Sequence, residues 1–307
     1  MSSGIIRFWG VRGSIPTPSK NTVIYGGNTA CVSIEFKDKD EIFIFDAGTG
    51  IRECGNYLLS LKKKLKGYIF ISHTHWDHIQ GFPFFVPFFI PGNTFKIFGP
   101  PSDVNKLNIK QIMEFQMKYE YFPIRVGELG AKIEYIDGKV GELNIDGYKI
   151  KTEKLNHPVF CLAYKIFYND KIIIYGGDHE PFRNIYRDDK KAASDMGFDE
   201  DYLIEYDKLV NEQNAKIYEF CENADIVIWD SQYSEEEYKT KIGWGHSYYE
   251  ANIKMAEISK IKHIVFNHHD PASSDEKLSA LEEKYSKIAE QKGFKLSFSR
   301  EGKSIEF

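Results

Sequence analysis

Three histidines and an aspartate stand within six consecutive residues, as His73, His75, Asp77 and His78. The apolar run before them, residues 68–71, predicts a buried strand. Residues two apart at the end of a strand point to the same side, so His73 and His75 can hold one metal ion. Asp77 and His78 follow where the backbone turns, and they can reach a second position nearby. Imidazole and carboxylate ligands without thiolate are typical of zinc, iron, manganese or cobalt at a hydrolytic centre.

Three further candidate ligands each follow a hydrophobic, strand-like run: His157, Asp178 and His268. Sheet-based sites are usually assembled from side chains just past the ends of strands. His268 competes for its role with the adjacent His269, and the register of the strand favours His268. His179 next to Asp178 is ambiguous. The chain therefore offers more ligands than one tetrahedral metal site needs.

The length and charge of the chain limit the classes of protein it can belong to. It has 307 residues and a formal net charge of −5, which argues against a dedicated nucleic-acid protein, since these are normally basic. Its cysteines, Cys31, Cys54, Cys161 and Cys221, are scattered without CxxC spacing. We expect them to be buried free thiols in a reducing cytoplasm. The N-terminus lacks the pattern of a signal peptide, which also predicts a cytoplasmic protein.

Residues 81–91 are intensely apolar and rich in phenylalanine. They are too few to span a bilayer, and three prolines prevent a continuous helix, so no membrane association is expected. The segment either packs on the core or at a subunit contact, or it lines a substrate pocket close to His78.

Strand-like and helical patterns alternate along the whole chain, which predicts an α+β fold with two sheets packed face to face and helices outside. Residues 183–222 are charged and have a helical pattern, which predicts a solvated helical insertion within a single domain of residues 1–307. Helices are predicted at residues 50–65 and at residues 276–292, the latter stopped by Gly293. Strands are predicted at residues 5–9, 31–36, 41–45, 68–72, 148–154, 162–167, 171–175, 225–229, 263–266 and 295–299.

With these motifs, the chain resembles the metallo-β-lactamase superfamily of hydrolases, along nearly its whole length. The resemblance implies an αβ/βα four-layer sandwich and a dinuclear metal site, with zinc as the first expectation and manganese or iron as alternatives. Asp46 matches the superfamily's buried aspartate behind the ligands, and Asp178 matches the carboxylate that bridges both metals. The implied metal ligands are His73, His75, Asp77, His78, His157, Asp178 and His268.

Within the superfamily, the chain is most similar to the branch of the tRNA 3′-processing nucleases and the phosphonate-pathway cyclic phosphodiesterases. Residues 243–247, before a helical pattern, and Asp230-Ser231-Gln232 carry this likeness. In the nucleases a Glu-Ala-Thr triplet takes the place of Asp230-Ser231-Gln232. The long Gly/Pro-rich arm with which many of these nucleases hold tRNA has no evident counterpart here.

The resemblance implies a phosphodiesterase in which a hydroxide bridging two metals attacks phosphorus, oriented by Asp77 and Asp178. His246 is the candidate general acid, with Asp230 fixing its tautomer. Ser247 and Glu250 have the spacing of a capping box, so a helix starting there would present its N–H groups to a phosphate.

The expected substrate is a small cyclic or nucleotide-like phosphodiester, without strong nucleic-acid binding, and a homodimer is one open arrangement. The alternatives are a tRNA 3′-processing nuclease and a lactone or thioester hydrolase of the same fold. A diiron redox protein of this fold would carry Glu in place of His75, so redox chemistry is disfavoured.

Overall fold

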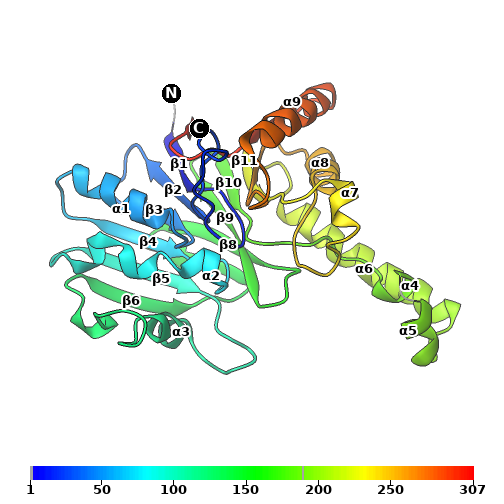
Figure 1. The fold of residues 1–307 in the computed structure, drawn as a ribbon, viewed down its shortest axis with the longest axis horizontal. Helices are drawn as coiled ribbons and strands as arrows, with labels where there is room; N and C mark the ends of the chain where they lie inside the picture. The colour runs from blue at the N-terminus through cyan, green and yellow to red at the C-terminus, as the bar shows by residue number, and fades with distance from the viewer. Residues whose placement is uncertain (1–2, 189) are drawn as a thin grey trace.

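Two seven-stranded sheets pack face to face, with helices on their outer sides (Figure 1). The computed structural model describes residues 3–188 and 190–307. The first sheet has the strand order β14-β1-β2-β3-β4-β5-β6, and the second has the order β13-β12-β11-β10-β9-β8-β7. The predicted α+β sandwich is therefore confirmed.

Helices separate runs of one to five consecutive strands along the chain. The strands are β1 (Gly4–Gly10), β2 (Cys31–Phe36), β3 (Ile42–Phe45), β4 (Lys66–Phe70), β5 (Thr94–Gly99), β6 (Lys132–Asp137), β7 (Gly141–Ile145), β8 (Tyr148–Leu155), β9 (Cys161–Tyr168), β10 (Lys171–Tyr175), β11 (Ile226–Asp230), β12 (His263–Asn267), β13 (Lys295–Phe298) and β14 (Ser304–Glu306). The helices are α1 (Ile51–Ser60), α2 (Trp76–Ile79), α3 (Ile109–Gln116), α4 (Ile185–Asp188), α5 (Lys190–Asp195), α6 (Glu200–Phe220), α7 (Glu235–Tyr238), α8 (Tyr249–Ile258) and α9 (Asp275–Gln291), with short 3-10 turns at Phe82–Phe84, Val86–Phe89 and Val126–Glu128.

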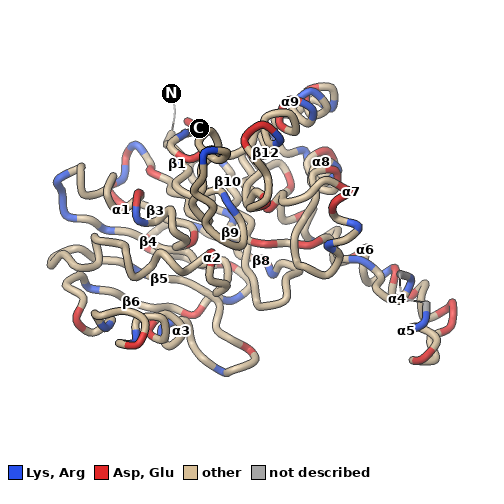
Figure 2. The backbone as a smooth tube through the Cα atoms, viewed as in Figure 1, with Lys and Arg blue, Asp and Glu red and all other residues tan. Residues whose placement is uncertain are grey.

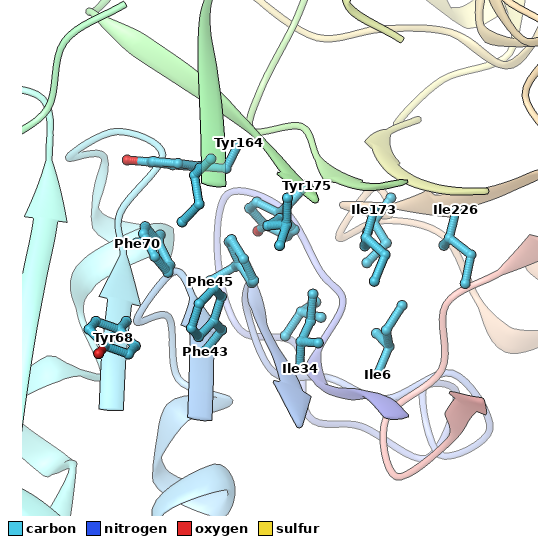
Figure 3. Packing of buried hydrophobic residues seen from close by; sticks show 14 of the residues in the cluster. Ile6, Ile34, Phe43, Phe45, Tyr68, Phe70, Tyr164, Ile173, Tyr175 and Ile226 are labelled. Atoms are coloured by element: carbon cyan, nitrogen blue, oxygen red, sulfur yellow. The ribbon is translucent and has the colours of Figure 1, made fainter. Parts of the chain in front are cut away.

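The main core lies between the two sheets and is rich in aromatic side chains. Phe43 and Phe45 of β3 point into this layer, where Phe45 stacks on Tyr175 of the opposite sheet at 5.1 Å between ring centroids (Figure 3). Ile42 and Ile44 alternate with them and join the cluster beneath α1. This two-residue period with both faces buried explains why β3 is apolar throughout.

All ten predicted strands form, but several boundaries differ and four strands were not predicted. β4 ends at Phe70 instead of residue 72, and α1 ends at Ser60 because Lys62 adopts a positive φ of 53°. The unpredicted strands are β5, β6, β7 and β14. β6, β7 and β14 lie at sheet edges, so their sequences lack the apolar runs of the central strands.

Helix α6 forms an arm together with α4 and α5, which lie at its far end, away from the sheets (Figure 1). The C-terminal part of α6 packs on the second sheet, where Ile217 is buried beside Val227. The other end extends into solvent. These helices fall within residues 183–222, whose status as an insertion in one domain stays a prediction; nothing is described for residue 189.

Candidate metal centre

The candidate ligands gather because parallel strands of both sheets end at one place. β3 pairs in parallel with β4 in the first sheet, and β10, β11 and β12 are parallel in the second. Asp46 follows β3, Asp178 comes after β10, and His268 follows β12. Each residue is buried.

The segment after β4 directs alternate side chains inward. His73 is fully buried and His75 lies 4.6 Å from it between ring centroids. Helix α2 then begins at Trp76, which is 67% exposed, and its single turn brings Asp77 and His78 into the interior. This agrees with the alternation expected from the sequence.

Three histidines surround one oxygen of Asp178. His73 Nε2 lies 3.5 Å from Asp178 Oδ2, and His157 Nε2 lies 3.9 Å from the same oxygen. His157 Nε2 is also 3.0 Å from His75 Nδ1. The ligand atoms of these four residues lie within 4.8 Å of one another.

A second group surrounds the other oxygen of Asp178. His78 Nε2 and His268 Nε2 each lie 3.3 Å from Asp178 Oδ1. Asp77 Oδ2 lies 3.1 Å from His268 Nε2 and 3.3 Å from His78 Nε2. Asp178 is thus placed between two groups of ligand atoms, one facing each of its oxygens.

The donor set fits divalent metal ions. Ligands about 2.0–2.1 Å from a tetrahedral zinc ion are roughly 3.3 Å apart, close to most of the distances above. His73 Nε2 is buried without a hydrogen-bond partner, which is costly unless a cation occupies the space it faces. Nitrogen and carboxylate donors without sulfur suit zinc, manganese or iron.

Asp46 contacts the second group through the outer ring nitrogen of His78. Its Oδ2 lies 2.7 Å from His78 Nδ1 and accepts a hydrogen bond from Tyr175 Oη at 2.8 Å. The backbone N–H of Ser72 donates to its Oδ1 at 2.7 Å. A carboxylate on the outer nitrogen of a ligand histidine fixes the ring orientation and directs Nε2 to the metal.

The buried histidines and carboxylates perturb each other's ionisation. Burial lowers the pKa of His73 well below its usual range. Burial alone would raise the pKa of Asp178, but His268 and His78 hold it well below the usual value. Both directions favour the ligand forms, a neutral imidazole and an ionised carboxylate.

His246 and Asp230 form a third group on the same carboxylate. His246 Nδ1 lies 3.1 Å from Asp230 Oδ2 and 3.7 Å from Asp178 Oδ2. Burial lowers the pKa of His246, but Asp230 outweighs it and raises the pKa to about 9. The structure therefore brings together all seven candidate ligands, Asp46, and the pair expected to donate a proton.

Glu180 is a residue of the site that the sequence analysis missed. Its buried carboxylate accepts hydrogen bonds from the backbone N–H groups of Gly243 at 2.8 Å and Gly245 at 2.9 Å. Tyr238 Oη donates to it at 2.6 Å. Gly245 in turn accepts from His157 Nδ1 at 2.9 Å. Its position two residues after Asp178 was the available signal.

The other histidines near the site point elsewhere. His269 Nε2 donates to the carbonyl of Ser299 at 3.0 Å and its ring stacks on Phe298. His179 Nδ1 accepts from the backbone N–H of Asn156 at 3.2 Å. His268, not His269, lies in the ligand groups.

The helix expected to begin at Ser247 begins later, so the predicted capping box was wrong. α8 starts at Tyr249 with Tyr248 as its N-cap, and Ser247 Oγ donates instead to Asn252 Oδ1 at 2.7 Å. The N–H of Ser247 lies 3.3 Å from Asp230 Oδ2, and that of Tyr249 donates to Tyr233. These N–H groups are occupied within the chain and are not presented to a phosphate.

The apolar segment at residues 81–91 packs mainly on the core. Phe82, Phe85 and Phe88 are buried in the cluster around α1, whereas Phe84 is 54% exposed. The packing alternative is therefore favoured over a role in lining the metal centre. Within the described residues, no helix has the length and apolar character needed to cross a membrane. The four cysteines are free and buried, as expected.

Relatives in sequence are ribonucleases. No family model matches the chain. Ribonuclease Z of Lactococcus lactis subsp. cremoris is 23% identical over 288 residues, covering 86% of this chain and 88% of the relative. Ribonuclease Z of Streptococcus suis is 22% identical and covers 93% of this chain and 96% of the relative.

Solved structures share the fold over the full chain. YhfI of Bacillus subtilis, a metallo-β-lactamase fold protein, has a TM-score of 0.65 at 15% identity, with complete coverage of both chains. A diphosphatase of the PhnP family has a TM-score of 0.61 at 15% identity, covering 99% of this chain and 98% of that one. The short form of human tRNase Z has a TM-score of 0.59 at 15% identity and covers 98% of both. The resemblance predicted from the sequence is confirmed at the level of the fold: this is a protein of the metallo-β-lactamase fold.

Proposed function

We propose that the protein is a dinuclear metal-dependent phosphodiesterase for a small cyclic or nucleotide-like phosphodiester. The observation that carries the proposal is the position of Asp178, whose two oxygens face two separate groups of ligand atoms. The adjacent His246–Asp230 pair supplies a proton donor for the leaving group, which a lactone or thioester hydrolase of this fold has no evident need for.

Two divalent ions, zinc by first expectation, would activate water and bind the phosphate oxygens. Asp77 and Asp178 are anionic and accept hydrogen bonds, so they orient the attacking group. His246 donates its proton to the leaving alkoxide. Asp230 fixes the tautomer by accepting from Nδ1, which leaves Nε2 as the donating nitrogen.

A small substrate fits the charge of the protein. Binding of nucleic acid depends chiefly on many Lys and Arg contacts to phosphates. Figure 2 shows acidic and basic residues interspersed over the body and the arm. α6 carries more acidic than basic residues, which does not favour a tRNA backbone along the arm.

The ribonuclease Z relatives favour a second candidate, a tRNA 3′-processing nuclease. Catalytic efficiency on cyclic nucleotides and small diesters, compared with a 3′-extended tRNA precursor under the same defined metals, separates the two. We expect turnover of small diesters. Site-specific cleavage of the precursor with negligible turnover of every small diester would establish the nuclease instead.

A further inference from the structure

A pocket of about 530 Å³ lies between the arm and the candidate metal centre. One end is lined by His157 and Gly245, which belong to the centre described above. The other end is lined by Tyr206 and Leu209 of α6. Its volume lies in the usual range for small-molecule sites.

The walls of the pocket combine apolar and aromatic side chains with several polar ones. Phe182 and Tyr206 supply rings, and Ile185 and Leu209 supply aliphatic surface. Leu209 is 48% exposed although it is apolar. An apolar wall of this kind next to polar catalytic groups is typical of a ligand site.

The part of the arm that forms the pocket is firmly attached. Asn214 of α6 makes two hydrogen bonds to the backbone of Phe182, accepting from its N–H at 3.1 Å and donating to its carbonyl at 2.8 Å. Asn184 Nδ2 donates to Asp207 Oδ1 at 2.8 Å and to the carbonyl of Leu203 at 3.1 Å. The wall is therefore held in place before a ligand arrives, which reduces the entropic cost of binding.

The charges in the wall offset each other. Arg183 Nε lies 3.6 Å from Glu180 Oε1. The group that fills the pocket is therefore best uncharged, while the phosphate it carries is held at the metal centre. Gln213, also in the wall, offers an amide that can both donate and accept hydrogen bonds.

We infer that the pocket holds the nucleoside part of a nucleotide-type phosphodiester, an inference that rests on the proposed phosphodiesterase function. A nucleobase stacks on aromatic side chains, and an amide such as Gln213 can pair with its edge. A purely aliphatic group would use the apolar wall but leave the amide of Gln213 unpaired when it displaced water.

Tyr206 and Tyr202 provide a matched pair of variants for the test. Both are aromatic residues on α6, but only Tyr206 lines this pocket, while Tyr202 is 39% exposed and stacks on Phe198. Binding of AMP, UMP and methyl phosphate to the metal-loaded protein is measured by calorimetry. Both nucleotides are expected to bind more tightly than methyl phosphate.

Tyr206→Ala should weaken nucleotide binding about fivefold to 150-fold, the loss of one stacking surface, and leave methyl phosphate unchanged. Tyr202→Ala should change neither. If Tyr206→Ala unfolds the arm, which circular dichroism reports, Gln213→Ala gives a second test with the same expected pattern.

Nucleotides that bind no better than methyl phosphate would overturn the inference, as would equal effects of Tyr206→Ala and Tyr202→Ala. In both cases hydrolysis of small diesters by the wild type would leave the proposed function standing. A protein that hydrolyses no phosphodiester at all would refute the proposed function itself.

Discussion

Replacement of His246 by alanine tests the assignment of a general acid. The side chain lies in a buried group, with Nδ1 3.1 Å from Asp230 Oδ2. Within the described residues, no hydrogen bond occupies its Nε2. That nitrogen can therefore donate a proton to a leaving group. Removal of the His246 side chain abolishes this proton transfer and leaves the ligands of the two metal groups in place.

The size of the effect depends on the leaving group. General acid catalysis contributes about 10²–10⁴-fold, which is roughly 3–5 kcal/mol of transition-state stabilisation. His246→Ala should therefore slow hydrolysis of alkyl phosphodiesters by about that factor. Nitrophenyl diesters release an anion that needs no proton, so they should lose far less.

The same substitution has a cost to folding that the assay must separate. The bond to Asp230 is charge-assisted, so its loss costs about 1.5–3 kcal/mol of unfolding free energy. The carboxylate keeps contacts with the backbone N–H groups of His179 and Ser247, at 3.2 and 3.3 Å. The variant should therefore still fold, which urea unfolding measures.

His263→Ala is the matched control, because this histidine is buried on β12 and its Nε2 bonds to Ser297 Oγ at 2.8 Å. It should change stability without changing the ratio of rates on alkyl and nitrophenyl diesters. Equal losses on both kinds of ester in His246→Ala would refute the reasoning, because His246 would then act only in binding or structure.

Three further predictions follow from the geometry of the site. Asp178→Asn should lower occupancy of both metal positions, while His157→Ala should mainly weaken one, as elemental analysis of dialysed protein measures. Glu180→Gln leaves one acceptor oxygen fewer for the N–H groups of Gly243 and Gly245, the residues that lead into His246. Because His246 would then be held less well, activity on alkyl diesters should fall more than activity on nitrophenyl diesters. Asp230 raises the pKa of His246 to about 9 against the effect of burial, and the acid works only while protonated. Asp230→Asn should therefore move the high-pH loss of activity on alkyl diesters to lower pH, visible in a pH–rate profile.

Much of the site could be predicted because its residues follow strands with clear patterns. His157, Asp178 and His268 each come after an apolar run, and strand ends meet at one edge. The role of Glu180 was harder to predict, since the hydroxyl of Tyr238 and the backbone N–H groups of Gly243 and Gly245 that it binds lie 58 to 65 residues away. The capping box at Ser247 does not form because its hydroxyl bonds to Asn252 and its N–H to Asp230.

The direction of the arm could not be predicted from the sequence either. Composition shows that residues 183–222 are charged and helical, but the pocket arises from hydrogen bonds between Asn214 and Phe182, which no local pattern encodes. The same holds for the edge strands β6 and β14, whose polar faces resemble loops.

The number of metal ions per chain tests the central claim most directly. The protein is purified without added metal, reconstituted with zinc, freed of excess ion and measured by elemental analysis. The placement of Asp178 between two groups of ligand atoms predicts two equivalents per chain. A result of at most one equivalent after reconstitution would contradict a dinuclear centre and the phosphodiesterase built on it.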